Sequence, residues 1–165
     1  MPSYNELPTN YINGDFIISP FSTFKTLMGC PDVITGDFSC DHTDITSLVG
    51  GPQQVGYDYY CTNTHITNLI GCASHIGGTL CFQDSNITSL VGIHKIIKSC
   101  NQFVFNPGKI TEGGIGLLMI ANLNFISKQT EPFKIIKKYL GQGTKGMMEC
   151  SKELKAKGFE SYAKL

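Results

Sequence analysis

A short phrase recurs four times in this chain of 165 residues, always at the same spacing. Each copy has an apolar residue, two polar residues, a leucine, a second apolar residue and a glycine. A fixed period of roughly 20 to 29 residues is typical of solenoids, in which every repeat forms one short coil, and the phrase falls within that range. The spacing therefore predicts an α/β solenoid. The four leucines are Leu27, Leu48, Leu69 and Leu90.

In most repeats, two apolar residues separated by one polar residue precede the leucine. In a short strand this alternation places both apolar side chains on the buried face. The step lengthens slightly after the fourth copy, and we expect about six coils within residues 1–128, with a period of about 21 residues. The expected inward pairs are Ile17 and Ser19, Phe38 and Cys40, Tyr59 and Cys61, Leu80 and Phe82, Phe103 and Phe105, and Leu123 and Phe125.

A small polar residue (Thr43, Thr64 or Ser85) lies between the strand and the leucine in three of the repeats. With Pro52 after the second leucine, this pattern resembles the leucine-rich repeat family, and in particular the short leucine-rich-repeat-like proteins of tailed bacteriophages. The resemblance covers about residues 14–128 and implies a right-handed coil with short parallel strands on its concave side. The family has an asparagine where this chain has Thr or Ser, whose hydroxyl makes a weaker bond to the backbone of the turn.

Residues 129–165 lack the repeat and predict a helical C-terminal cap. Thr130, two residues before a proline, indicates the start of a helix, and Gly141 indicates its end. A second helix is expected from about Met147 to Lys157. The end of a solenoid exposes apolar side chains and strand edges, which a cap covers. A role of this segment in partner binding or oligomer formation is the alternative.

Charge is divided unevenly along a chain whose formal net charge is zero. Residues 1–108 carry three Lys against eight Asp or Glu, a balance of −5, whereas residues 109–165 carry ten Lys against five Glu, a balance of +5. The chain has no arginine, the residue that most often binds guanine and phosphate through two hydrogen bonds. This composition argues against a nucleic acid as the partner.

The remaining composition favours a cytoplasmic protein without a membrane segment. No apolar run approaches the roughly 18 residues of a membrane span, and the first residues lack the basic and apolar regions of a secretory signal. Seven cysteines is an odd number, which argues against a complete disulfide framework and favours buried free thiols in a reducing compartment. If a phage encodes the chain, that compartment is the host cytoplasm.

Four cysteine and histidine residues have spacings that superficially suit a tetrahedral zinc site. The repeat places Cys61 inside the coil and Cys72 on a distant turn, so we expect no metal. Cys81 is expected to point outward, but no histidine aligns with it to act as a base. We therefore expect neither a cofactor nor enzymatic activity. The four residues with zinc-like spacing are Cys61, His65, Cys72 and His75.

The outward positions of successive strands form the candidate binding site. Tyrosine offers a large contact area and a hydrogen bond at low entropic cost, and the three aspartates beside it attract a basic protein surface. The alternative is that these side chains only contact solvent. The candidate binding residues are Asp37, Ser39, Asp41, Asp58, Tyr60, Thr62, Cys81 and Gln83.

Together these features predict a non-enzymatic protein-binding module. The resemblance to phage proteins implies that the partner is a host protein, namely an enzyme or a defence protein that the module inhibits or redirects. Two alternatives come from other classes. One is a homo-oligomer that sequesters a small polar or nucleotide ligand, which the lack of arginine disfavours. The other is a structural component of the virion.

Overall fold

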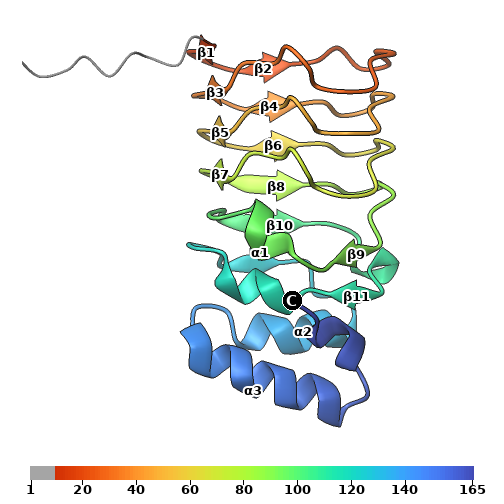
Figure 1. The fold of residues 1–165 in the computed structure, drawn as a ribbon, viewed down its shortest axis with the longest axis vertical. Helices are drawn as coiled ribbons and strands as arrows, with labels where there is room; N and C mark the ends of the chain where they lie inside the picture. Colours follow the sequence, from red (N-terminus) through yellow and green to blue (C-terminus); the bar gives the residue numbers. More distant parts are fainter. Residues whose placement is uncertain (1–9) are drawn as a thin grey trace, which may run out of the picture.

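Strands from successive repeats of the sequence pair side by side. The computed structural model describes residues 10–165, which form an α/β fold with parallel sheets. A four-stranded sheet has the order β1-β3-β5-β7, and a six-stranded sheet has the order β12-β10-β8-β6-β4-β2. Figure 1 shows the strands stacked one above another, with the first repeat in red at one end and the helical tail in blue at the other.

The strands are only two or three residues long. We number the repeats 1 to 6: repeats 1 to 4 contribute one strand to each of the two larger sheets, and repeats 5 and 6 contribute β10 and β12. A two-stranded sheet pairs β9 with β11. The bounds are β1 Tyr11–Ile12, β2 Phe16–Ile17, β3 Val33–Ile34, β4 Phe38–Ser39, β5 Gln54–Val55, β6 Tyr59–Tyr60, β7 His75–Ile76, β8 Thr79–Cys81, β9 Ser89–Leu90, β10 Gln102–Val104, β11 Glu112–Gly113 and β12 Phe125–Ile126.

The repeated leucines form a column of the hydrophobic core, and each is at most 3% exposed. A second column comes from the strands, where residues in parallel register stack their side chains across the sheet. The inward positions predicted for repeats 2 to 5 are therefore confirmed. The buried strand residues are Phe38, Cys40, Tyr59, Cys61, Leu80, Phe82, Phe103 and Phe105, and Leu123 of repeat 6 is also buried.

Buried threonines connect β4 and β6 to the turns that follow them. The Thr43 hydroxyl donates to the carbonyl oxygen of Cys40 at 2.7 Å, and the Thr64 hydroxyl donates to that of Cys61 at 2.9 Å. These bonds satisfy backbone acceptors in a place that water does not reach. The expected bonds from hydroxyl to turn backbone are therefore present at both positions.

The inward residues of repeat 1 are Phe16 and Ile18 rather than the predicted Ile17 and Ser19. Phe16 lies beside Phe38 in the register between β2 and β4, and Ile17 is 64% exposed. Phe16 pairs with a residue 22 positions later, whereas Phe38 pairs with one 21 positions later. The difference arises because repeat 1 has one more residue than repeat 2 between its strand and the turn residue with positive φ, which is Phe21 in repeat 1 and His42 in repeat 2. The repeat period alone therefore placed this strand one residue out of register.

The inward residue of repeat 6 is Ile126 rather than the predicted Phe125. Ile126 lies beside Phe103 in the register of β10 and β12 and is fully buried, whereas Phe125 is 40% exposed. The strands of repeats 5 and 6 each follow the preceding strand by a longer step than those of repeats 3 and 4. The helix α1 (Ile93–Ile96) and the 3-10 turn Ile115–Met119 account for the longer steps.

Two helices cover the last repeat, α2 (Glu131–Lys138) and α3 (Gly143–Ala156) (Figure 1). Thr130 is the N-cap residue of α2 as predicted, although its side chain makes no capping hydrogen bond. The second helix begins at Gly143, four residues before the predicted Met147. Phe133 of α2 is fully buried at the end of the core. Short 3-10 turns lie at Pro107–Lys109 and Glu160–Ala163.

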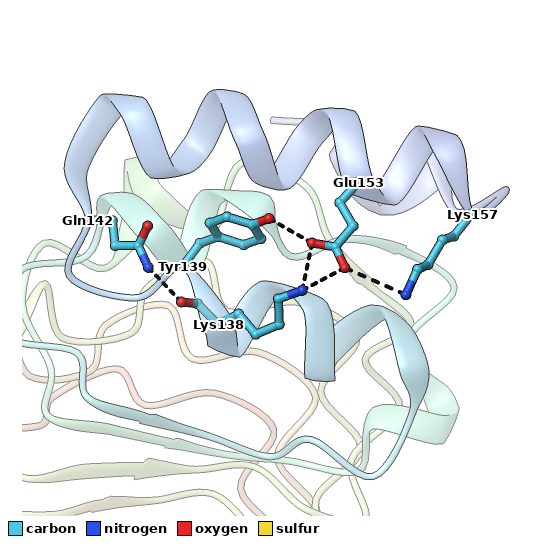
Figure 2. Close-up of polar contacts among 5 residues, drawn as sticks. All are labelled: Lys138, Tyr139, Gln142, Glu153 and Lys157. Carbon is cyan, nitrogen blue, oxygen red and sulfur yellow. Dashed lines mark hydrogen bonds and ion pairs between the residues drawn. The ribbon is translucent and has the colours of Figure 1, made fainter.

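Glu153 of α3 forms hydrogen bonds with residues at the end of α2 (Figure 2). Its carboxylate accepts hydrogen bonds from Lys138 Nζ at 2.7 and 2.8 Å and from the Tyr139 hydroxyl at 2.6 Å. Lys157 Nζ lies 3.6 Å from the same group. The bond from Lys138 and then that from Tyr139 lower the pKa of Glu153, and the bond to Glu153 raises the pKa of Tyr139 to about 12. These contacts hold α3 against α2.

Candidate functional site

The outer face of the six-stranded sheet, defined by the eight candidate residues, runs along repeats 2 to 4. Ser39, Tyr60 and Cys81 occupy one register column on this face, and Val104 continues it in repeat 5. A second column holds Asp37 and Asp58 beside β4 and β6, and a third holds Asp41, Thr62 and Gln83 just beyond the strands. The structure therefore brings the predicted residues together on neighbouring repeats.

The aspartates of this face also bind the backbone of the next repeat. Asp15 Oδ1 accepts the amide hydrogen of Asp37 at 2.8 Å, Asp37 Oδ1 accepts that of Asp58 at 2.9 Å, and Asp58 Oδ1 accepts that of Thr79 at 2.7 Å. Asp41 accepts the amide hydrogen of Thr62 in the same way. Since an ionised carboxylate is a strong acceptor, this aspartate ladder stabilises the stack, and no sequence motif had indicated it.

Glycines leave room for two of these carboxylates. A Cβ atom on Gly36 would lie 2.1 Å from Asp15 Oδ1, and one on Gly78 would lie 2.2 Å from Asp58 Oδ1. Neither distance is possible between nonbonded atoms, so a larger residue at either position would displace the carboxylate or the backbone. The glycine before Asp37 and the glycine before Thr79 are therefore part of the aspartate ladder. Tyr57 precedes Asp58, so the bond from the Asp58 amide to Asp37 forms without a glycine.

Tyr60 is held in place by the carboxylate that supports the next repeat. Its hydroxyl donates to Asp58 Oδ2 at 2.8 Å, while Asp58 Oδ1 accepts the amide hydrogen of Thr79. The bond to Asp58 is the main reason that the pKa of Tyr60 rises to about 12. The phenol is therefore protonated at neutral pH, and its hydrogen bond to Asp58 restrains the half-buried ring.

Cys81 lies on the outer face as predicted but is only 9% exposed. Tyr60 and Val104 flank it in register, and Thr62 Oγ1 lies 3.3 Å from its sulfur. The neighbouring side chains therefore cover a thiol that the outward position had suggested was open. Gln83, by contrast, is exposed beyond the end of β8.

The four residues with zinc-like spacing do not converge. Cys61 and Cys72 are buried, and desolvation raises the pKa of both thiols, which disfavours the thiolate that metals bind. His65 and His75 are exposed, His65 at 4.0 Å from Asp44 and His75 at 2.9 Å from the Ser74 hydroxyl. Within residues 10–165, no group of three His, Cys, Asp or Glu side chains is placed to hold a metal ion.

A row of exposed apolar side chains follows the repeated leucines and lies outside the predicted site. Its members recur at the spacing of the leucines, each directly before a glycine with positive φ, and are between 42% and 73% exposed. The Ser or Asn two residues earlier accepts the amide hydrogen of three of them. In the sequence, the apolar residue after each repeated leucine was the signal that could have predicted this row. The row consists of Met28, Val49, Ile70 and Val91.

A groove of about 430 Å³ runs along the four-stranded sheet and continues into repeats 5 and 6. Polar side chains of four repeats line it, namely Gln54, His75, Asn101 and Asn122, with Gly56 and Gly77 between them. A Cβ atom on Gly77 would lie 1.9 Å from the Gly56 carbonyl oxygen, so close stacking of the repeats excludes larger residues here. The hollow is therefore a consequence of the stacking.

Comparison of the chain with protein-family models, with curated proteins and with solved structures found no match. Among residues 10–165, no helix combines the length and the apolar character needed to cross a lipid bilayer.

Proposed function

We propose that this chain is a leucine-rich-repeat-like solenoid that binds a protein partner and has no enzymatic activity. Parallel pairing between the strands of successive repeats and a buried leucine in each of repeats 1 to 4 support the solenoid. In this proposal residues 10–128 wind as a right-handed coil, and residues 129–165 form its C-terminal cap. The predicted start of the coil at residue 1 lies outside the described residues. A solenoid exposes a ladder of side chains along its sheet, which is the usual binding surface of such proteins.

The fixed position of Tyr60 is the observation that carries the proposal. A tyrosine whose hydroxyl is bonded to Asp58 at 2.8 Å loses little conformational entropy on binding, so more of its contact energy contributes to affinity. Tyrosine is also enriched among the residues that dominate protein interfaces. The outer face therefore offers a rigid aromatic contact surrounded by polar groups.

The charge of the outer face indicates a basic partner surface. Asp37, Asp41 and Asp58 lie on adjacent repeats, and residues 1–108 as a whole carry a balance of −5. Opposite charges steer association and select the partner more than they add to affinity. The second half of the proposal rests on the resemblance to phage proteins. The partner is then a host enzyme or defence protein in the host cytoplasm, and this module inhibits or redirects it.

The test is affinity capture from bacterial lysate with a chain that carries Asp37→Asn and Asp58→Asn. Asparagine keeps the carbonyl oxygen that accepts the amide hydrogen of the next repeat, but it removes the charge and, at residue 58, the oxygen that accepts from the Tyr60 hydroxyl. We expect the unaltered chain to retain one protein and the double variant to lose it, with near-equal melting temperatures. Glu149→Gln and Glu160→Gln remove two charges from the tail and serve as the matched control. Equal capture by both variants would exclude the outer face.

The groove along the four-stranded sheet supports a second candidate, sequestration of a small polar or nucleotide ligand. Its volume of about 430 Å³ falls within the range of ligand sites, roughly 300 to 1,000 Å³. The amide and imidazole groups of Gln54, His75 and Asn101 would bind it by hydrogen bonds. Calorimetry with a panel of nucleotides tests this candidate, and we expect heat of binding that His75→Ala removes. No heat with any nucleotide would exclude nucleotides.

A further inference from the structure

The end of the stack at repeat 1 leaves part of the core column uncovered. Phe24 occupies the position that Ile45, Ile66 and Ile87 hold in repeats 2 to 4. These three isoleucines are at most 2% exposed, whereas Phe24 is 66% exposed. A hollow of about 170 Å³ lies beside it, lined in part by Phe16, Ile18 and Met28. Phe24 is therefore a core residue without a covering layer among the described residues.

The strand edge at this end is also open. Phe16 and Ile18 donate their amide hydrogens to Asp37 and Ser39 of repeat 2, at 2.8 and 2.9 Å. Alternate residues of a strand direct their backbone groups to opposite edges, so the amide and carbonyl of Ile17 face away from the stack. β2 is the last strand of its sheet in the described part of the chain. Such an edge readily pairs with another strand.

Phe21 adds an independent observation at the same end. Its backbone has φ 64° and its side chain is 84% exposed. The equivalent turn residues His42, Asn63 and Asp84 also have positive φ, but they belong to the types that tolerate this conformation, whereas a bulky aromatic residue there is strained. Phe21 is not among the residues that pack against the core, so burial within this chain does not compensate for the strain.

We propose that this end, defined by Phe21, Phe24, Met28 and the open edge of β2 and called the repeat-1 face, docks onto the same face of a second copy. These side chains expose about 450 Å² per chain, taking the size of large apolar side chains as about 200 Å². A two-fold dimer buries at most that area on both copies, about 900 Å² in total, which together with the paired edges of β2 is the size of a weak, reversible interface.

Charge and symmetry both favour a second copy as the occupant. Asp15 and Lys25 are the charged residues of segment 10–30, and their charges cancel, so two copies of the repeat-1 face do not repel each other. A two-fold axis pairs β2 with β2 of the other copy in antiparallel orientation, which satisfies both open edges. The opposite end is covered by α2 and α3, so the assembly closes at two copies.

The experiment measures mass by light scattering and shape by small-angle X-ray scattering on the full chain. We expect a dimer at about 100 µM that dissociates on dilution, with nearly twice the maximum dimension of the monomer. Phe21→Asn supplies a residue type found in the other turns, so it should weaken the dimer by about tenfold or more without lowering the monomer's melting temperature. Tyr57→Asn, which replaces a 65% exposed aromatic residue of repeat 3, is the matched control and should leave the dimer intact.

Three results would overturn the proposal. A full chain that stays monomeric at the highest concentration excludes the dimer. A dimer whose maximum dimension barely exceeds that of the monomer places the contact on a side of the stack, such as the row around Ile70. The full chain could instead be monomeric and dimerise only after residues 1–9 are deleted. That result would mean that these residues, and not a second copy, occupy the repeat-1 face.

Discussion

Among the described residues, the core is covered at one end of the stack and exposed to solvent at the other. At one end Phe133 of α2 packs on Phe105, with ring centroids 4.9 Å apart, and is fully buried. At the other end Phe24 continues a core column and is 66% exposed. The repeats themselves propagate the core in both directions without a stop. The difference shows that closure of such a stack is encoded by the segment that follows the repeats and not by the repeats.

Truncating each aromatic residue gives the largest expected contrast between the ends. Phe133→Ala removes a fully buried ring and should lower the free energy of unfolding by about 3–5 kcal/mol. Phe24→Ala removes a ring that solvent already reaches and should cost less than about 1 kcal/mol. Urea denaturation of both variants at low protein concentration measures the difference, and Phe133→Leu, which keeps most of the volume, is the control. Equal losses would mean that the two ends are equally covered.

The aspartate ladder provides the next contrast. Asp58→Ala leaves the half-buried amide of Thr79 and the Tyr60 hydroxyl without their acceptor and should cost about 1–3 kcal/mol. Asp15→Ala removes the same kind of bond beside the exposed first repeat and should cost about 0.5–1 kcal/mol.

The matched control for the ladder is asparagine at the same two positions, which keeps the acceptor oxygen. Thermal melts should show that both asparagine variants lose less stability than their alanine counterparts. If alanine and asparagine behave alike at residue 58, the carboxylate contributes by its charge or by its bond to Tyr60 and not by its bond to the backbone.

A smaller effect is expected from Glu153, which joins the helices of the cap (Figure 2). Its pKa is lowered in the folded protein, mainly by the hydrogen bond from Lys138. A carboxylate of this kind stabilises the fold above its unfolded pKa of about 4.3, and the contribution disappears as the pH falls through the lower, folded pKa.

Because the lysine partners of Glu153 are more than half exposed, Glu153→Gln should cost under about 1 kcal/mol at pH 7. The cost should shrink towards zero near pH 3, which urea melts at the two pH values can measure. Glu149→Gln removes a carboxylate that pairs with Lys152 within one helix and is the control. A penalty for Glu153→Gln that does not change with pH would mean that packing and not charge holds α3.

The smallest effect has the opposite sign. Phe21→Asn replaces a strained aromatic residue with one that accepts positive φ, and it should raise the free energy of unfolding of the monomer by up to about 1 kcal/mol. The measurement requires dilute protein, so that loss of self-association does not mask the gain. A clear loss of stability would show that the ring of Phe21 packs on its own chain.

The sequence predicted the middle of the stack better than its ends. The period placed Leu48, Tyr59 and Leu80 in the core because identical repeats impose identical surroundings. It failed for Ile17 and Phe125, because an extra residue in repeat 1 and the inserted helical turns in repeats 5 and 6 shift the strands. A period carries no information about such insertions.

The sequence predicted which residues lie on the outer face but not which hydrogen bonds they make. Alternation along a strand identifies outward positions such as Tyr60, and parallel register then brings neighbouring repeats together. The bonds from Asp37 and Asp58 to backbone amides depend on the exact stacking of one repeat on the next. The covered state of Cys81 likewise depends on side chains of two other repeats.

The aspartate ladder has a consequence for how this protein can change in evolution. Because Asp37 and Asp58 each bond to the repeat that follows, these internal junctions are made in the same way. Duplication or loss of one whole repeat in this part of the chain would therefore create a junction of the kind already present and leave both ends as they are. Each added repeat would lengthen the sheet by about 4.8 Å, so gene duplication could adjust the reach of the outer face in fixed steps.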